Sequence, residues 1–189
     1  MVIAMERNYI FKFIIILVLL ISGLLIPTKD SYASNPKIIG FIIEAAQMEG
    51  TMKDPVMITG DTAEQKDRPM LELNFDNLTA EGLSIKKLVQ SQKGIITLDM
   101  SPKETVLFSS LSLHVTNAEF TDNYLPANGN IGLKNIKLLA HHVSANNSSL
   151  PQFNLSFNDG GQVEMEPKSE EDLLQMQTYL ENLLNSTQQ

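Results

Sequence analysis

Apolar and polar residues alternate with a period of two along much of this chain. The clearest run has Phe153, Leu155 and Phe157 on one face, with polar residues between them. Because successive side chains of a β-strand point to opposite faces, this period predicts strands with one face buried. Runs of the same kind occupy residues 71–75, 96–100 and 107–116.

Short turn-forming sequences separate the alternating runs. Examples are Arg68-Pro69, Gln92-Lys93-Gly94, Ser101-Pro102 and Asp159-Gly160-Gly161. Strands that recur at short spacing without helices between them pair as antiparallel neighbours. The sequence therefore predicts a mainly β fold, either an antiparallel sandwich or a barrel-like sheet.

Two segments depart from simple alternation. Residues 38–48 are rich in isoleucine and leave no polar face over their first half, which predicts a strand buried on both sides. Residues 50–69 are polar and turn-rich around the short apolar run 56–58. We expect residues 50–69 to form a long hairpin connection with solvated charges.

One helix is expected over residues 169–185. Ser169 followed by Asp172 resembles a capping box, and two glutamates add negative charge to the first turn. Apolar residues then recur at helical spacing: Leu173, Met176, Leu180, Leu183 and Leu184. We expect this helix to lie across one end or face of the sheet, and the alternative is docking on a partner.

Residues 7–33 have the features of an export signal. Arg7 and Lys12 precede an apolar run of 14 residues, 13–26, and the segment ends in Ser31-Tyr32-Ala33. A helix needs about 20 residues to cross a bilayer core, so this run is short for a stable span. Small residues at 31 and 33 suit signal peptidase, which predicts a signal peptide 1–33 and cleavage before Ser34. The alternative is an uncleaved N-terminal anchor.

Composition limits what the exported part can do. Residues 34–189 carry 11 basic and 20 acidic side chains, a net charge of −9, so we expect no nucleic-acid binding. The chain has no cysteine, which excludes disulfides and cysteine-based zinc sites. We expect residues 34–189 to form a single β-rich domain, with strands over about 37–166 before the helix. Such an exported chain is typical of a Gram-positive bacterium and predicts an extracytoplasmic protein, secreted or in the cell envelope.

Short sequences in two regions resemble an exported domain-of-unknown-function family of Gram-positive bacteria. They are Ala45-Ala46-Gln47-Met48-Glu49-Gly50-Thr51, Ala118-Glu119-Phe120-Thr121-Asp122-Asn123 and Ser149-Leu150-Pro151-Gln152-Phe153-Asn154-Leu155. The resemblance implies an exported protein and carries over no functional residue. The alternation is also similar to the β-folds of envelope lipid carriers of the lipopolysaccharide-transport type, which is a likeness of fold alone.

The candidates for a metal site are His114, His141 and His142. Adjacent residues on a strand point to opposite faces, so His141 and His142 cannot chelate one ion from regular β geometry. A nucleophile elbow of the G-x-S-x-G type is missing from the sequence. We therefore predict no metal, no cofactor and no catalytic residue, and expect the histidines to be solvated or hydrogen-bonded.

Nine methionines offer adaptable apolar surface, which a β-sandwich or barrel can use to hold an apolar ligand. We predict an exported, non-enzymatic protein that binds an apolar or polymeric envelope ligand, such as a lipid, and contacts the membrane only through its N-terminal segment before cleavage. The alternatives are a secreted hydrolase and a structural protein of an extracellular matrix or coat. A pocket lined by Met, Leu and Phe would favour the binder, and a long exposed sheet edge would favour the structural protein.

Overall fold

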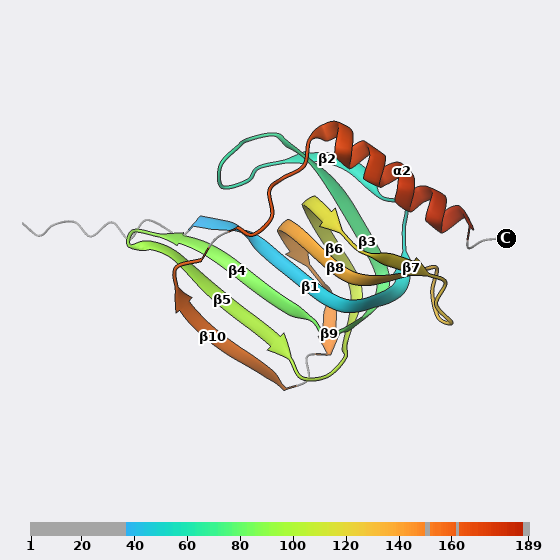
Figure 1. Ribbon diagram of the computed structural model, residues 1–189, viewed down its shortest axis with the longest axis horizontal. Helices are drawn as coiled ribbons and strands as arrows, with labels where there is room; N and C mark the ends of the chain where they lie inside the picture. Colours follow the sequence, from blue (N-terminus) through green and yellow to red (C-terminus); the bar gives the residue numbers. More distant parts are fainter. Residues whose placement is uncertain (1–36, 150–151, 162, 187–189) are drawn as a thin grey trace, which may run out of the picture. The chain divides into compact units, whose positions relative to one another are not determined.

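The computed structural model describes residues 37–149, 152–161 and 163–186, all within the unit Asn35–Gln189. Within these ranges the chain forms ten strands and one helix (Figure 1). They are β1 (Lys37–Met52), β2 (Val56–Gly60), β3 (Arg68–Glu81), β4 (Ser84–Ser91), β5 (Gly94–Pro102), β6 (Val106–Glu119), β7 (Asp122–Tyr124), β8 (Ile131–Ser144), β9 (Asn147–Ser149), β10 (Phe153–Asp159) and α2 (Glu170–Ser186). The strands pair antiparallel, which confirms the predicted mainly β fold with a C-terminal helix. The predicted signal peptide lies outside the described residues.

β3 and β4, which are consecutive in the chain, pair with successive parts of the long strand β1. Residues 47–52 of β1 pair with β3, and residues 37–44 pair with β4. Gly82 lies between β3 and β4 with a φ of 61°, a left-handed conformation that favours glycine. On the edges that face away from β1, β4 pairs with β5 and β3 pairs with β6. Pairs of consecutive strands thus lie side by side with other long antiparallel segments of the sheet.

Four of the strands close into a ring. β1 pairs with β3, β3 with β6, β6 with β8, and β8 returns to β1. The other end of the sheet stays open: β1 continues there through β4 and β5 to β10, the last strand of that path. Ring-like closure is thus combined with an open sheet of four strands, which we call the open sheet (Figure 1).

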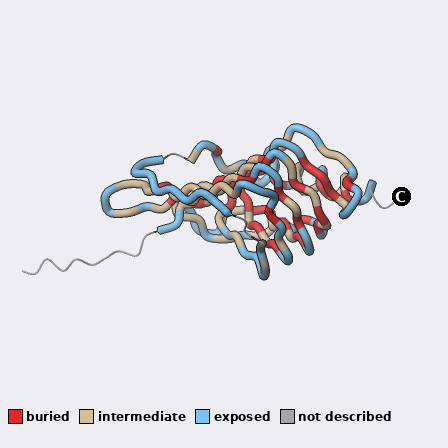
Figure 2. Tube along the Cα trace, turned by 90° about the horizontal axis from the view of Figure 1, so that it is seen from below, coloured by how far each residue is buried: buried red, intermediate tan, exposed pale blue. Residues whose placement is uncertain are grey.

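The main core fills the ring. Buried apolar side chains from its four strands form one cluster, and Leu71, Val115 and Ala140 in it have no exposed surface. Buried residues gather accordingly in one part of the sheet (Figure 2). Burying a Leu or Val side chain contributes about 1.5–3 kcal/mol, so this cluster dominates the stability of the fold.

Helix α2 lies across β2, β3 and β6 and adds its apolar stripe to the main core (Figure 1). Leu173, Leu180 and Leu184 are buried there. The helix begins as predicted: the backbone N–H of Asp172 donates to Oγ of Ser169 at 3.1 Å, and the Ser169 hydroxyl donates to Asp172 at 2.6 Å. The predicted helix 169–185 is confirmed to within one residue at each end.

A second, smaller core lies on the other face of β1. Ile42, Leu88 and Leu139 are buried there together with Met165, which belongs to the connection between β10 and α2. Ion pairs hold this connection to the sheet, because Glu164 lies 3.0 Å from Nζ of Lys137 and 3.2 Å from Nζ of Lys86. Because a core lies on each face of β1, the predicted strand over residues 38–48, buried on both sides, is confirmed.

Three expectations are wrong in part. Residues 50–69 are not a continuous loop, because β1 extends to Met52 and residues 56–60 form β2 on the edge of β3. The strands end at Asp159 rather than near 166, and residues 163–169 form an irregular connection. Strand β10 exists as predicted but is exposed along its whole length, because it ends the open sheet and no second layer packs on it among the described residues.

Candidate functional site

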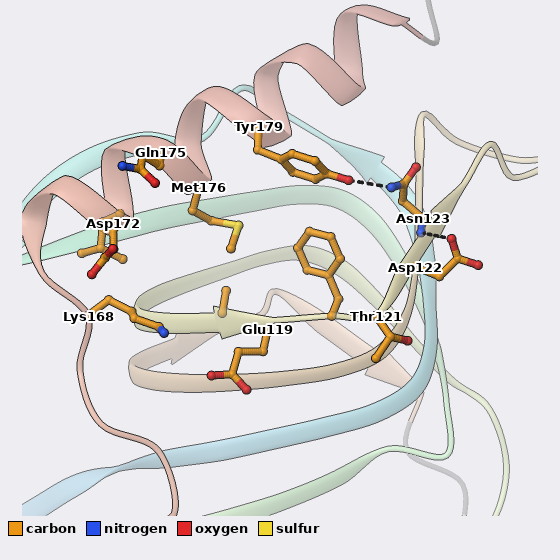
Figure 3. Close-up of a pocket in the computed structure, with 12 residues that line it drawn as sticks. Glu119, Thr121, Asp122, Asn123, Lys168, Asp172, Gln175, Met176 and Tyr179 are labelled. Carbon is orange, nitrogen blue, oxygen red and sulfur yellow. Dashed lines mark hydrogen bonds between the residues drawn. The ribbon is translucent and has the colours of Figure 1, made fainter.

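A groove of about 660 Å³ runs between α2 and the end of β6 (Figure 3). Residues 118–123 form one wall and α2 forms the other. The lining residues are Ala118, Glu119, Phe120, Thr121, Asp122, Asn123, Lys168, Asp172, Leu173, Gln175, Met176 and Tyr179. Ligand sites in proteins commonly measure about 300–1,000 Å³, so the groove has the size of a small-molecule site.

The floor of the groove is apolar. Met176 and Tyr179 are three residues apart on α2 and therefore project from the same side of the helix toward the groove (Figure 3). Phe120 follows the end of β6, and its ring centroid lies 5.7 Å from that of Tyr179. Methionine and aromatic side chains together give an adaptable surface for an apolar group.

Hydrogen bonds fix the polar wall of the groove. Nδ2 of Asn123 donates to the Tyr179 hydroxyl at 2.6 Å, which links β7 to α2 (Figure 3). Next to it, Oγ1 of Thr121 accepts a hydrogen bond from Nδ2 of Asn135 at 2.8 Å. Because these side chains are held by protein partners, the wall is largely formed before any ligand arrives.

Acidic side chains outnumber basic ones around the groove. Glu119, Asp122 and Asp172 line it, against Lys168. The Ser169 hydroxyl and backbone N–H lower the pKa of Asp172, so this carboxylate stays charged at neutral pH. Asp122 lies 3.9 Å from Nζ of Lys134, a contact that leaves it partly screened. The net negative rim favours a ligand with a cationic or neutral polar group beside its apolar part.

His141 is half-buried and is held by two hydrogen bonds. Its Nδ1 lies 3.1 Å from the carbonyl oxygen of Ile39, and its Nε2 lies 2.9 Å from Oγ1 of Thr116. Since a carbonyl only accepts, Nδ1 carries the proton and Nε2 accepts from the Thr116 hydroxyl. Burial lowers the pKa of His141 below its ordinary value, so the imidazole is neutral at pH 7.

His114 and His142 lie together elsewhere, on neighbouring strands. They are directly opposite in the pairing of β6 with β8, and their ring centroids are 4.7 Å apart. Nε2 of His114 lies 3.5 Å from Oε1 of Glu72. The structure thus joins His114 to His142 and gives His141 other partners. Among the residues that the structure describes, no group of three or more His, Cys, Asp or Glu side chains gathers in a way that could hold a metal ion.

The inner side of the open sheet is a second apolar surface. Register across the strands places Phe41, Ile85, Leu98, Met100, Leu155 and Phe157 on this face, together with Lys87, whose Nζ lies 5.7 Å from the centroid of the Phe41 ring. Phe157 is 70% exposed and Leu155 is 48% exposed. Exposed apolar side chains grouped in this way mark surfaces that meet a ligand or a partner.

Sequence reasoning found parts of the groove without placing them together. Met176 was recognised in the apolar stripe of the helix, whereas Tyr179 carried no signal of its own. The groove arises where the end of β6 meets α2, about 50 residues later in the chain, and local periodicity does not report such contacts.

Comparison of the chain with protein-family models, with curated proteins and with solved structures gives no significant match. No helix in the described part of the chain is long and apolar enough to cross a membrane.

Proposed function

We propose that this protein is an exported or envelope-associated, non-enzymatic protein that binds an amphipathic envelope ligand in the groove beside α2. The observation that carries the proposal is the apolar floor of Phe120, Met176 and Tyr179, set beneath a rim of acidic residues. The export signal predicted over residues 7–33 supports an extracytoplasmic location.

The lining of the groove defines the ligand by its chemistry. An alkyl or other apolar segment fits against Phe120 and Met176, where it would be removed from water. A cationic group fits near Glu119, and a hydrogen-bonding group fits near the Tyr179 hydroxyl, at two different parts of the groove edge (Figure 3). A lipid-like molecule with an amino group combines the two features.

The hydroxyl–imidazole contact does not favour the hydrolase alternative. Thr116, the residue hydrogen-bonded to His141, has no exposed surface, so a substrate could not reach its hydroxyl. A hydrolytic triad also needs a carboxylate to orient the histidine, whereas Nδ1 of His141 meets the backbone carbonyl of Ile39. Thr116 and His141 are therefore better explained as a structural pair.

Binding of a fluorescent alkyl chain tests the proposal. Two probes carry the same dansyl-labelled undecyl chain, one ending in an ammonium group and the other in a carboxylate. We expect the ammonium probe to bind more tightly, and Glu119→Gln to reduce that preference by about two- to five-fold, as for one exposed charge pair. Equal affinity for the two probes would contradict the role given to the rim.

Matched variants on α2 locate the binding surface. Met176→Gln keeps the length of the side chain but makes the groove floor polar, and we expect about five-fold weaker binding. Leu174→Gln makes the same kind of change two residues away at a position that is 46% exposed and does not line the groove. Equal effects of the two variants would place the ligand elsewhere.

A further inference from the structure

Strand β10 is an open edge of the sheet. It pairs with β5 on one side and is the last strand in the order of the open sheet. Each of its seven residues is exposed. Backbone groups on the free side of such a strand form a template for another strand.

The backbone hydrogen bonds beside β10 show which of its residues face outward. The carbonyl of Gln152 accepts from Lys103 at 3.1 Å, and the N–H of Gly160 donates to Ile95 at 2.8 Å. Because backbone direction alternates along an antiparallel strand, even-numbered residues of β10 face β5. The N–H and C=O groups of Phe153, Leu155 and Phe157 therefore point to the free edge.

This edge has few of the features that usually block strand addition. The register between β10 and β5 runs without a bulge from Phe153 to Asp159. The strand contains neither proline nor lysine, and Asp159 at its end is its only charged residue. Natural edge strands are commonly protected by short length, bulges, prolines or charges. At the opposite end of the strand order, β7 has only three residues.

We propose that β10 pairs antiparallel with β10 of a second copy of this chain, on a two-fold axis through Leu155. In this register Leu155 meets its own copy and Phe153 meets Phe157, so apolar residues are opposite apolar residues on the inner face. On the other face Asn154 meets Ser156. Asp159 lies beyond the paired apolar residues, so like charges do not oppose each other at the centre.

The pairing of side chains across the contact favours this register over its neighbour. A pairing centred on Ser156 would also match outward residues with outward residues, but it would set Phe153 against Asp159. Aromatic pairs directly across two strands stabilise a sheet, whereas an aromatic ring opposite a carboxylate does not. The two-fold contact uses the same strand in both copies and therefore closes as a dimer.

Cysteine cross-linking of the full chain tests the contact, since the chain has no cysteine of its own. Directly paired residues have Cα atoms about 5.5 Å apart, within disulfide range. We expect Leu155→Cys to form a covalent dimer on oxidation. Leu107→Cys, at a position on β6 that is 54% exposed, serves as the control and should stay monomeric. Equal cross-linking of the two variants would overturn the proposal.

The register has its own test. A mixture of Phe153→Cys and Phe157→Cys chains should cross-link to a heterodimer, while each variant alone should give much less product. Cross-linking of Phe157→Cys to itself in preference would contradict a centre at Leu155.

Sedimentation of a proline variant tests the backbone contact without a cross-link. Leu155→Pro removes an N–H that faces the free edge and leaves the bonds to β5 in place, whereas Leu155→Ala removes the side chain alone. We expect the proline variant to be monomeric at concentrations where the alanine variant still dimerises. If the proline variant fails to fold, the cysteine variants decide; a folded proline variant that dimerises like wild type would overturn the proposal.

Discussion

The Thr116 hydroxyl lies 2.9 Å from Nε2 of His141, and both residues are the unpaired ones in an irregular stretch between β6 and β8. His114 pairs with His142 and Val115 with Ala140, so His141 is skipped; Asn117 then pairs with Leu139, so Thr116 is skipped. The two skipped side chains satisfy each other. His141 also bonds the carbonyl of Ile39 and thereby ties β1 to the same place.

This arrangement predicts a pH dependence of stability that belongs to His141. Its folded pKa lies below the ordinary 6.5, so the unfolded chain binds the proton more readily. Its contribution is therefore complete above pH 6.5 and is lost as the pH falls toward the folded pKa. Urea unfolding at about pH 8 and about pH 5.5 should show a loss for wild type that is smaller for His141→Gln.

His114 and His142 are common to wild type and this variant, so the comparison isolates His141. Equal losses for the two proteins between the two pH values would show that His141 does not control this dependence.

A charge placed in the main core should destabilise the protein strongly, whereas a charge placed on the open sheet should not. Leu113 is 1% exposed in the main core, and we expect Leu113→Asp to destabilise the protein by about 3–5 kcal/mol. The same change at Leu155 should cost less than about 1 kcal/mol, because that side chain is 48% exposed. Denaturant titration measures both, below the concentration at which dimers form.

The alternation at Phe153, Leu155 and Phe157 predicts that Leu155 is on a buried face, where a charge would unfold the protein as well. The exposure of β10 changes that expectation. A severe loss for Leu155→Asp in the monomer would mean that β10 is covered after all.

The paired histidines should be dispensable for binding. Replacing His114 and His142 with Ala should leave the affinity for the ammonium probe unchanged, because neither residue lines the groove. His141→Ala, in contrast, leaves the Thr116 hydroxyl without its partner and should cost about 1–3 kcal/mol of stability. Probe titration and thermal unfolding of each variant check both statements. A folded His114→Ala, His142→Ala double variant that no longer binds would point to a ligand-binding or metal role for these side chains.

The N-terminal segment gives a separate prediction. Expression of the full chain in an exporting Gram-positive host should yield a protein that begins at Ser34, because the apolar run of 14 residues suits signal peptidase better than the bilayer. N-terminal sequencing or intact mass measurement decides the point. A protein that keeps residues 1–33 would be an anchored one.

Local sequence patterns predict the positions of the strands and the helix better than they predict which of these are buried. The Ser169–Asp172 cap and the leucine spacing located α2 to within one residue, because capping and periodicity are local properties. The isoleucines of β1 likewise indicated a strand with two buried faces. Alternation at Phe153, Leu155 and Phe157 correctly gave a strand but not its exposure, which depends on whether another layer covers it.

The short strand β2 shows the converse limit. Val56–Gly60 lies among polar and turn-forming residues, so its own sequence indicates a loop. Its pairing with β3, from Val56 opposite Glu72 to Gly60 opposite Arg68, makes it a strand. The groove likewise depends on tertiary contacts, because Phe120 and Tyr179 are far apart in the sequence and meet only in the fold.

Photo-cross-linking of the bound ligand tests the central claim most directly. The ammonium probe would carry a diazirine on its alkyl chain, and mass spectrometry would identify the residues that it labels. A ligand in the groove predicts labels on Phe120, Met176 and Tyr179, with competition by the unlabelled probe. Labels confined to Leu98, Leu155 and Phe157 would instead place the ligand on the inner face of the open sheet and contradict the assignment of the groove.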